Sequence, residues 1–318
     1  MSHPKNIRLF VGNANPPLGN AICELFALRP APLKLDKFPD LEIQCKIEDD
    51  VRGSDAFIIQ PTCPPVNDSL MELLIMIDCL RRASAERITA VVPYFGYARQ
   101  DRKDEGRVPI TAKLVANLIT KAGADRVLTM DLHAAQIQGF FDIPVDHLGA
   151  SQEFYDHYRK LKIPDLTVLA PDVGSSKRAG HFSRALNAPL AVVDKRRLSP
   201  TEVRAVNVIG TVDGRNVLIP DDMISTAGTL VTAVETAREH GAKDIYICAT
   251  HALLSGPAVQ RLNGLPIKEL AFTDTIPLNP MKAAELKNYT VLSVARLLKE
   301  AIRRIHTSES ISILFDTE

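Results

Sequence analysis

Two adjacent carboxylates, Asp221 and Asp222, follow a short apolar segment and precede a hydroxyl-rich turn that opens a helical run. The turn ends at Gly228 and Thr229, where a helix start offers an anion free backbone N–H groups, a positive dipole end and hydroxyl donors. Gly228 has no Cβ that would hold a ligand away from the backbone. The carboxylates would repel a phosphate, so they favour sugar hydroxyls or a metal ion beside it. The pattern therefore predicts a sugar-phosphate site.

Two other kinds of structure contain a strand, a small turn and a helix. A nucleotide P-loop is excluded, because the pattern G-x-x-x-x-G-K-[ST] occurs nowhere in the chain. Residues 217–229 also fit a plain strand–turn–helix unit whose serine or threonine caps the helix. This second interpretation predicts a structural hydrogen bond and no ligand.

The segment 93–107 carries a second set of polar side chains. An aromatic turn follows Pro93 and leads into a stretch dense in both charge signs, which cannot be buried without complete ion pairing. A solvated surface loop is the simpler interpretation. Arg99 and Gln100, however, follow an expected strand at its carboxyl end, where α/β sheets bind ligands. The planar arginine fork suits a phosphate and stacks on a purine.

Further candidate ligands lie after other expected strands. Asp131 and Asp172 offer hard oxygen atoms suited to Mg²⁺, and His133 ends the strand beside Asp131. A lone histidine is equally well explained by a structural role. The small turn at 174–176 enters a helix and is a second candidate anion site. The three cations at 195–197 form either a solvated face or a clamp on a polyphosphate.

Apolar runs alternate with helical patterns along almost the whole chain. Several runs are nearly continuous in Val, Ile and Leu, which is typical of parallel strands covered on both faces. The expected strands are residues 7–11, 56–60, 88–92, 127–130, 167–170, 190–193, 217–219, 245–249 and 269–272. The expected helices include residues 67–85, 111–122, 175–186 and 229–240. This alternation predicts a doubly wound α/β fold.

One unit of this pattern occurs twice. Residues 123–133 run from Gly-Ala through a strand to a histidine, and residues 241–251 do the same with identical spacing. Each copy follows a helical segment that contains Leu-Val. Chance similarity is the alternative to duplication. Duplication predicts two similar domains, residues 1–149 and 150–318, and a chain of 318 residues suits two domains of ordinary size.

Composition limits the classes of function. Apolar residues make up 46% and charged residues 24%, as in soluble globular proteins. The formal net charge is zero, so neither nucleic acid nor an anionic membrane has a global electrostatic attraction for the chain. The five cysteines lack C-x-x-C or metal-like spacing, and the N-terminus lacks an apolar signal region. We therefore expect a cytosolic protein with reduced thiols.

Several motifs together resemble those of one enzyme family. Asp221-Asp222 and the turn up to Thr229 are similar to the loop that binds 5-phosphoribosyl 1-diphosphate (PRPP) in phosphoribosyltransferases and ribose-phosphate pyrophosphokinases. The second family is distinguished by motifs at residues 97–103, 130–134, 136–144, 194–197 and 255–258. The similarity extends from about residue 38 to residue 315 in the family's order. The chain is thus identified as resembling the ribose-phosphate pyrophosphokinases, or PRPP synthetases.

The resemblance implies two phosphoribosyltransferase-like domains. It also implies a Mg²⁺-dependent reaction in which the diphosphoryl group of ATP is transferred to the anomeric hydroxyl of ribose 5-phosphate. The products would be PRPP, for nucleotide biosynthesis, and AMP. It implies a ribose 5-phosphate site made of Asp221, Asp222, Ser225, Thr226, Ala227, Gly228 and Thr229. It implies an ATP site made of Arg99 and Gln100 with, from a neighbouring subunit, Phe38, Asp40 and Glu42. His133 and Asp172 would place Mg²⁺, and the catalytic cations would be Lys195 and Arg197.

The resemblance also implies regulation and assembly. Members of the family commonly form cytosolic hexamers built from dimers, which an ATP site shared between subunits requires. Four residues match a regulatory phosphate/ADP site: Arg52, Ser84, Ser310 and Ser312. Asp50 lies near that site where a neutral residue is usual, and a carboxylate there opposes anion binding.

Some residues depart from the family pattern. Ser225 stands where the PRPP loop usually has Asp, which is expected to preserve binding while changing the rate. Leu41 replaces a usual Gly in the segment expected to contact ATP, and Gly174-Ser175 replaces a usual Gly pair after Asp172. Two rival functions remain: a phosphoribosyltransferase that consumes PRPP, and a non-catalytic subunit that regulates active partners.

Overall fold

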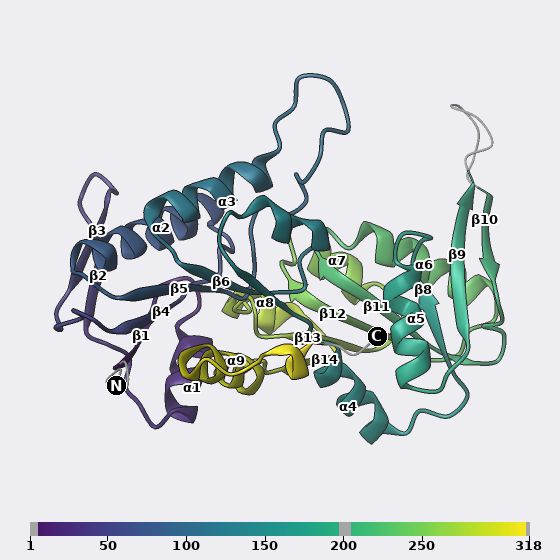
Figure 1. The fold of residues 1–318 in the computed structure, drawn as a ribbon. Helices are drawn as coiled ribbons and strands as arrows, with labels where there is room; N and C mark the ends of the chain where they lie inside the picture. The colour runs from purple at the N-terminus through teal and green to yellow at the C-terminus, as the bar shows by residue number, and fades with distance from the viewer. Residues whose placement is uncertain (1–5, 197–204, 316–318) are drawn as a thin grey trace. The chain divides into compact units, whose positions relative to one another are not determined.

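The computed structural model describes residues 6–196 and 205–315, of which 195–196 and 205–206 are described by their backbone only. The chain forms two compact units (Figure 1). Among the described residues, the first contains 6–149, 275–277 and 293–315, and the second contains 150–196, 205–274 and 278–292. The predicted second domain, residues 150–318, was therefore wrong at its end. The C-terminal helix α9 (Ala295–Thr307) belongs to the first unit because its apolar face packs against α1 (Pro16–Leu25).

The first unit is built on a five-stranded parallel sheet. Its strand order is β1 (Ile7–Val11), β4 (Asp55–Ile59), β5 (Arg87–Val92), β6 (Arg126–Met130) and β7 (Val145–Leu148). Helices α2 (Val66–Arg82) and α3 (Thr111–Ala122) lie on one face, and α1 and α9 lie on the other (Figure 1). Every residue of β4 is buried, as a strand covered on both faces requires. A separate hairpin pairs β2 (Leu33–Lys37) with β3 (Ile43–Ile47).

The second unit is built on a seven-stranded sheet. The strand order is β10 (Ala205–Ile209), β9 (Leu190–Arg196), β8 (Leu166–Ala170), β11 (Asn216–Ile224), β12 (Ile245–Ala252), β13 (Ile267–Thr273) and β14 (Tyr289–Leu292). All neighbours are parallel except β9 and β10. The remaining helices are α4 (Ser151–Leu161), α5 (Ser176–Ala185), α6 (Gly228–Glu239), α7 (Ala258–Asn263) and α8 (Pro280–Glu285).

The strand order of the second sheet reverses between β8 and β11. From β8 the chain continues through α5 to β9 on one side, and from β11 it continues through α6 to β12 on the other. Because parallel crossovers are right-handed, α5 and α6 lie on opposite faces of the sheet. The carboxyl ends of β8 and β11 therefore open between the starts of two helices, which is where doubly wound sheets bind ligands. The predicted α/β class with two parallel-sheet domains is confirmed.

The sequence prediction missed the β2–β3 hairpin and the full length of β11. In β2 and β3, apolar and polar residues alternate without a continuous apolar run, so the hairpin was missed. β11 extends beyond its predicted end at residue 219 and includes both aspartates of the candidate site. Its register with β12 persists up to Ile224 and Ala252. No helix in the described part of the chain is long and apolar enough to cross a membrane.

Candidate active site

The predicted sugar-phosphate loop lies at the strand-order reversal of the second sheet. Asp221 and Asp222 lie within β11, and only residues 225–227 separate that strand from α6. The Asp222 N–H donates to Asp221 Oδ1 at 2.8 Å, and the Met223 N–H donates to Asp222 Oδ1 at 2.9 Å. Asp222 is buried and Asp221 is half-buried. The two carboxylates are thus held in fixed orientations by the strand that carries them.

The electrostatics of this pair favour a ligand that donates hydrogen bonds or carries positive charge. Burial, followed by the neighbouring charge of Asp222, raises the pKa of Asp221 from 3.8 to about 8. Arg178 acts in the opposite direction but is the smallest contribution. At neutral pH the ligand-free pair therefore retains a proton. Sugar hydroxyls or a cation would stabilise the charged carboxylates and lower this pKa.

No side chain caps the backbone N–H groups where the turn enters α6. Ala227 precedes α6 in the left-handed conformation, with φ of 62°, and no side chain caps the helix. This contradicts the simpler interpretation, in which a serine or threonine caps the helix. The carbonyl oxygens of Ile224 and Ser225 accept hydrogen bonds from the N–H groups of Leu254 (2.9 Å) and Ser255 (2.8 Å).

The end of the turn meets a side chain that the sequence interpretation did not select. Arg261 Nη1, on α7, donates to the Thr226 carbonyl at 2.9 Å. A Cβ built on Gly228 would lie 3.8 Å from this nitrogen and 3.9 Å from Thr226 Oγ1. The loop therefore has room for a side chain at Gly228, and folding does not require glycine there. The exposed residues of the turn are Thr226, Gly228 and Thr229.

Asp172 lies two residues beyond the end of β8, the neighbour of β11. Its Oδ1 accepts hydrogen bonds from the N–H and the Oγ of Ser175, both at 2.9 Å. These bonds orient the carboxylate at the start of α5. Asp172 thus follows β8 at the same carboxyl edge of the second sheet as the pair Asp221 and Asp222 on β11. This edge gathers three carboxylates and the starts of two helices.

His133 belongs to the first unit, in the exposed segment that follows β6. His147 Nε2 accepts a hydrogen bond from the Leu132 N–H at 2.8 Å, and its Nδ1 lies 3.3 Å from Gln138 Nε2. Asp131 has a φ of 38°, which turns the chain sharply before His133. Within residues 6–196 and 205–315, no group of three or more His, Cys, Asp or Glu side chains is arranged to hold a metal ion.

Arg99 and Gln100 are exposed in the long connection between β5 and α3. The Gln100 N–H donates to the Tyr97 carbonyl at 2.9 Å, and its carbonyl accepts from the Ala112 N–H at 3.1 Å. The Thr111 hydroxyl donates to Gln100 Oε1 at 2.5 Å. These contacts hold the backbone beside Arg99 against the start of α3.

The residues expected to contact ATP from a neighbouring subunit lie at the exposed tip of the β2–β3 hairpin. The Phe38 N–H donates to the Glu42 carbonyl at 2.8 Å, and the Glu42 N–H donates to Asp40 Oδ1 at 3.2 Å. Leu41 closes the turn with a φ of 73°, in the left-handed region that favours glycine. The glycine that the resemblance leads us to expect at this position would adopt this conformation without strain.

The predicted catalytic cations are only partly described. Arg197 lies outside the described residues, and Lys195 is described by its backbone, which pairs with Val206 in β9 and β10. Their predicted roles therefore stay predictions.

The four predicted regulatory residues all belong to the first unit, where two close pairs can be traced. The Gly53 N–H donates to the Ser84 carbonyl at 3.0 Å, which joins the Arg52 turn to Ser84. The hydroxyls of Ser310 and Ser312 lie 2.6 Å apart. Asp50 Oδ1 accepts from the Arg52 N–H at 3.0 Å, so the carboxylate expected to oppose an anion stabilises this turn.

A buried ion pair between Arg87 and Asp55 holds the end of the C-terminal helix α9. Arg87 Nε donates to Asp55 Oδ1 at 2.7 Å, and its Nη2 donates to the Ile305 carbonyl at 2.8 Å. His306 Nδ1 lies 2.7 Å from Asp55 Oδ2. Asp55 is fully buried, so removing either partner would leave a costly unpaired charge. Contacts between residues more than 200 positions apart gave no signal in the sequence.

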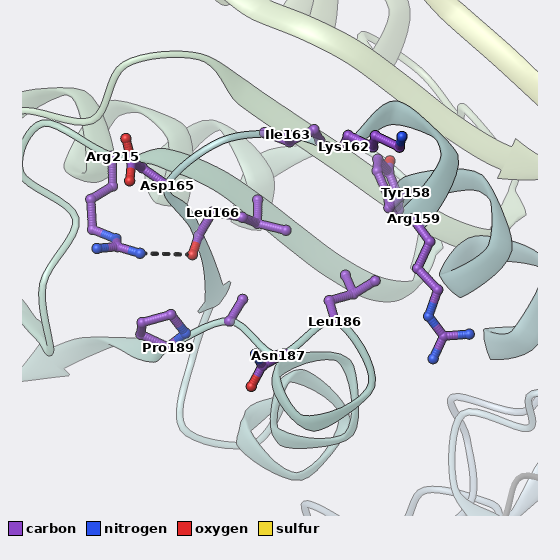
Figure 2. A pocket seen from close by; sticks show the side chains of 11 residues that line it. Tyr158, Arg159, Lys162, Ile163, Asp165, Leu166, Leu186, Asn187, Pro189 and Arg215 are labelled. Atoms are coloured by element: carbon purple, nitrogen blue, oxygen red, sulfur yellow. Dashed lines mark hydrogen bonds between the residues drawn. The ribbon is translucent and has the colours of Figure 1, made fainter.

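A cavity of about 420 Å³ lies at the opposite, amino edge of the second sheet (Figure 2). Arg215 donates to Thr167 Oγ1 and to the Leu166 carbonyl, and Arg159 donates to the Ala185 carbonyl. These cations thus bind backbone and hydroxyl oxygens of their own domain. The cavity is separate from the carboxyl edge that carries the candidate site.

The fold and the loop together define the class: a two-domain α/β protein whose second sheet carries paired aspartates and a short turn into a helix at its strand-order reversal. Residues 7–123 match the family described as the N-terminal domain of ribose phosphate pyrophosphokinase, and residues 196–316 match the phosphoribosyl synthetase-associated domain. The chain is 58% identical over 314 residues to a ribose-phosphate pyrophosphokinase of Rhodopirellula baltica, covering 98% of this chain and 99% of that one.

Two further comparisons agree. A ribose-phosphate pyrophosphokinase of Caldanaerobacter subterraneus is 52% identical, with 98% and 99% of the two chains covered. A crystal structure of phosphoribosylpyrophosphate synthetase from Mycobacterium smegmatis superposes with a TM-score of 0.90 at 42% identity, covering 96% of this chain and all of that one. The chain belongs to the ribose-phosphate pyrophosphokinase family of enzymes.

Proposed function

We propose that this chain transfers the diphosphoryl group of ATP to the anomeric hydroxyl of ribose 5-phosphate. The anomeric oxygen forms a bond to the β-phosphorus while the bond from that phosphorus to the α–β bridging oxygen breaks, so AMP leaves and PRPP forms. The hydroxyl proton passes to solvent. The observation that supports this proposal best is the short turn at the strand-order reversal, beside the paired aspartates of β11. Family membership supports the same reaction.

The turn and the aspartates divide the recognition of ribose 5-phosphate. The N–H groups and hydroxyls at residues 225–229 suit the 5-phosphate, because a helix start favours an anion. Asp221 and Asp222 suit the ribose hydroxyls, which donate hydrogen bonds to carboxylates and offset the charge repulsion that raises the pKa of Asp221. Ser225 contributes a hydroxyl where the family usually has a carboxylate, so it adds no repulsion toward phosphate.

A carboxylate at the carboxyl edge of the second sheet suits a magnesium ion that is held mostly by substrate. Mg²⁺ is commonly bound through one or two protein ligands, with water and substrate phosphates completing its coordination. The carboxylate of Asp172, which Ser175 orients, is one proposed protein ligand of the ion. His133 is the other. When bound, the ion would neutralise negative charge that develops on the phosphate groups during transfer.

The remaining roles follow the family's motifs. Arg99 and Gln100 bind ATP, together with Phe38, Asp40 and Glu42 from the hairpin tip of a second copy in a hexamer built from dimers. The exposure of that tip and of Arg99 supports this assignment. Lys195 and Arg197 stabilise the charge on the transferring group, where one arginine contributes about 10³- to 10⁵-fold in rate.

One assay tests the proposal against both rival functions. Purified protein is incubated with ATP, ribose 5-phosphate and Mg²⁺, and AMP and PRPP are measured. We expect both products in equal amounts, dependent on all three components. PRPP consumption that requires a purine or pyrimidine base would identify a phosphoribosyltransferase. Absence of both products, with stimulation of an active family member on mixing, would identify a regulatory subunit.

A further inference from the structure

The motif at residues 255–258 distinguishes the family, but neither the sequence nor the proposed reaction gives it a role. In the structure, the segment that contains this motif supplies three donors, which bind the consecutive carbonyls of residues 224–226. The Leu254 N–H binds the Ile224 carbonyl at 2.9 Å, and the Ser255 N–H binds the Ser225 carbonyl at 2.8 Å. Arg261 Nη1 completes the series at the Thr226 carbonyl, at 2.9 Å.

These three hydrogen bonds determine which face of the loop an anion meets. In a planar trans peptide the C=O of one residue and the N–H of the next point in opposite directions. Because the carbonyls at 224–226 point toward residues 254–261, the N–H groups at 225–227 point away from that segment. Carbonyl lone pairs repel phosphate oxygens, whereas N–H groups bind them. The segment thus orients the loop for an anion.

Arg261 also creates an unbalanced charge at the start of α6. Its Nη1 would lie only 3.8 Å from a Cβ on Gly228, the first residue of that helix. A cation has the unfavourable sign at a helix N-terminus, where acidic residues normally provide the complement. The first turn of α6 contains no acidic residue. A bound phosphate would satisfy both the helix dipole and the guanidinium.

We propose that Arg261 is a positioning residue of the ribose 5-phosphate site. It holds the Thr226 carbonyl away from the anion, and its charge adds to that of the α6 N-terminus in attracting the 5-phosphate. This proposal rests on the proposed function, because it assumes that ribose 5-phosphate binds at this loop.

The test compares Arg261→Met with Arg238→Met. Arg238 Nη1 makes contacts of the same kind at the other end of α6, with the carbonyls of Ala242 (3.0 Å) and Lys243 (2.7 Å). The dissociation constant of ribose 5-phosphate is measured by calorimetry, and kcat and KM are measured at saturating ATP. Loss of a hydrogen bond that involves a charged group is expected to raise Kd and KM by about 10- to 100-fold in Arg261→Met. We expect kcat to change far less, and Arg238→Met to match the wild type.

The outcomes separate the two proposals. An unchanged Kd in Arg261→Met overturns the role of Arg261 while the proposed function stands. Failure of the wild type to bind ribose 5-phosphate overturns both. If Arg261→Met does not fold, Arg261→Gln decides, because its amide is still a hydrogen-bond donor while the positive charge is lost. A Kd for Arg261→Gln that is raised several-fold supports the proposal, and a wild-type Kd overturns it.

Discussion

The connection from β5 to α3 and the connection from β11 to α6 occupy corresponding places in the two units. Each runs from a parallel strand to a helix, and a left-handed glycine, Gly123 or Gly241, follows the helix before the next strand. In the second unit three residues join strand to helix, whereas in the first the connection extends from Pro93 to Ile110. The short connection can only present backbone and small side chains. The long one presents exposed Arg99 and Gln100.

The histidines of the sequence repeat show the same divergence. His133 is exposed after the end of β6, whereas His251 is buried within β12. The difference arises because β11 continues through its aspartates to Ile224, so β12 stays paired up to Ala252. β5 ends at Val92, and β6 is paired with it only up to Thr129. Extending one strand therefore removes a histidine from solvent and places two carboxylates at the sheet edge instead.

If the short connection binds the sugar phosphate through its backbone, Gly228→Ala should have the largest effect. A Cβ there meets only ordinary contacts, at 3.8 and 3.9 Å, so the protein should fold with an unchanged melting temperature. The added methyl group would block close approach of phosphate to the backbone. We expect KM for ribose 5-phosphate to rise by about 10- to 100-fold, as for loss of a charged hydrogen bond, with KM for ATP little changed. An unaltered KM for ribose 5-phosphate would show that the turn is only structural.

If the long connection binds ATP through side chains, Arg99→Met should show the opposite selectivity. Loss of one exposed arginine–phosphate contact should raise KM for ATP by about 10-fold and leave KM for ribose 5-phosphate within twofold. Steady-state kinetics with each substrate varied in turn measures both values. Arg102→Met, three residues further along the same charged loop, is the matched control and should be silent. Equal effects on both substrates would contradict the division of roles between the two connections.

Much of this division follows from local sequence, and the rest from contacts that sequence patterns do not reveal. Apolar runs predicted the parallel sheets, and residue types around Asp221 and Gly228 predicted a strand that runs through a short turn into a helix, because both signals lie within a few positions. Arg261 acts 35 residues from Thr226 in the sequence, so its contact gave no local signal. The assignment of α9 to the first unit depends on packing with α1, which no periodicity reports.

The raised pKa of Asp221, in the strand that leads into the short connection, predicts that the stability of the protein depends on pH. Its folded pKa of about 8 lies above the ordinary 3.8, so between these values the folded protein binds a proton that the unfolded chain releases. Stability of the ligand-free enzyme should therefore fall as pH rises from about 4 to about 8. Asp221→Asn should flatten this dependence and raise the melting temperature at pH 8, whereas exposed Asp244→Asn should do neither. A melting temperature of Asp221→Asn that follows the wild type at every pH would contradict the buried-charge account.

The smallest effect concerns the hairpin tip that is proposed to join the ATP site of a second copy. Leu41 is 72% exposed and has a φ of 73°, so it gains little from burial and carries left-handed backbone strain. Leu41→Gly removes a backbone strain of about 1–2 kcal/mol. Glycine also makes the unfolded chain more flexible, and this entropy offsets part of the stabilisation. We expect a net stabilisation of up to about 1 kcal/mol in urea unfolding. Ile313→Gly is the control, since Ile313 is equally exposed and is not among the residues with positive φ. If Leu41→Gly destabilises the protein as much as Ile313→Gly does, the strain is absent, and the departure from glycine needs another physical cause.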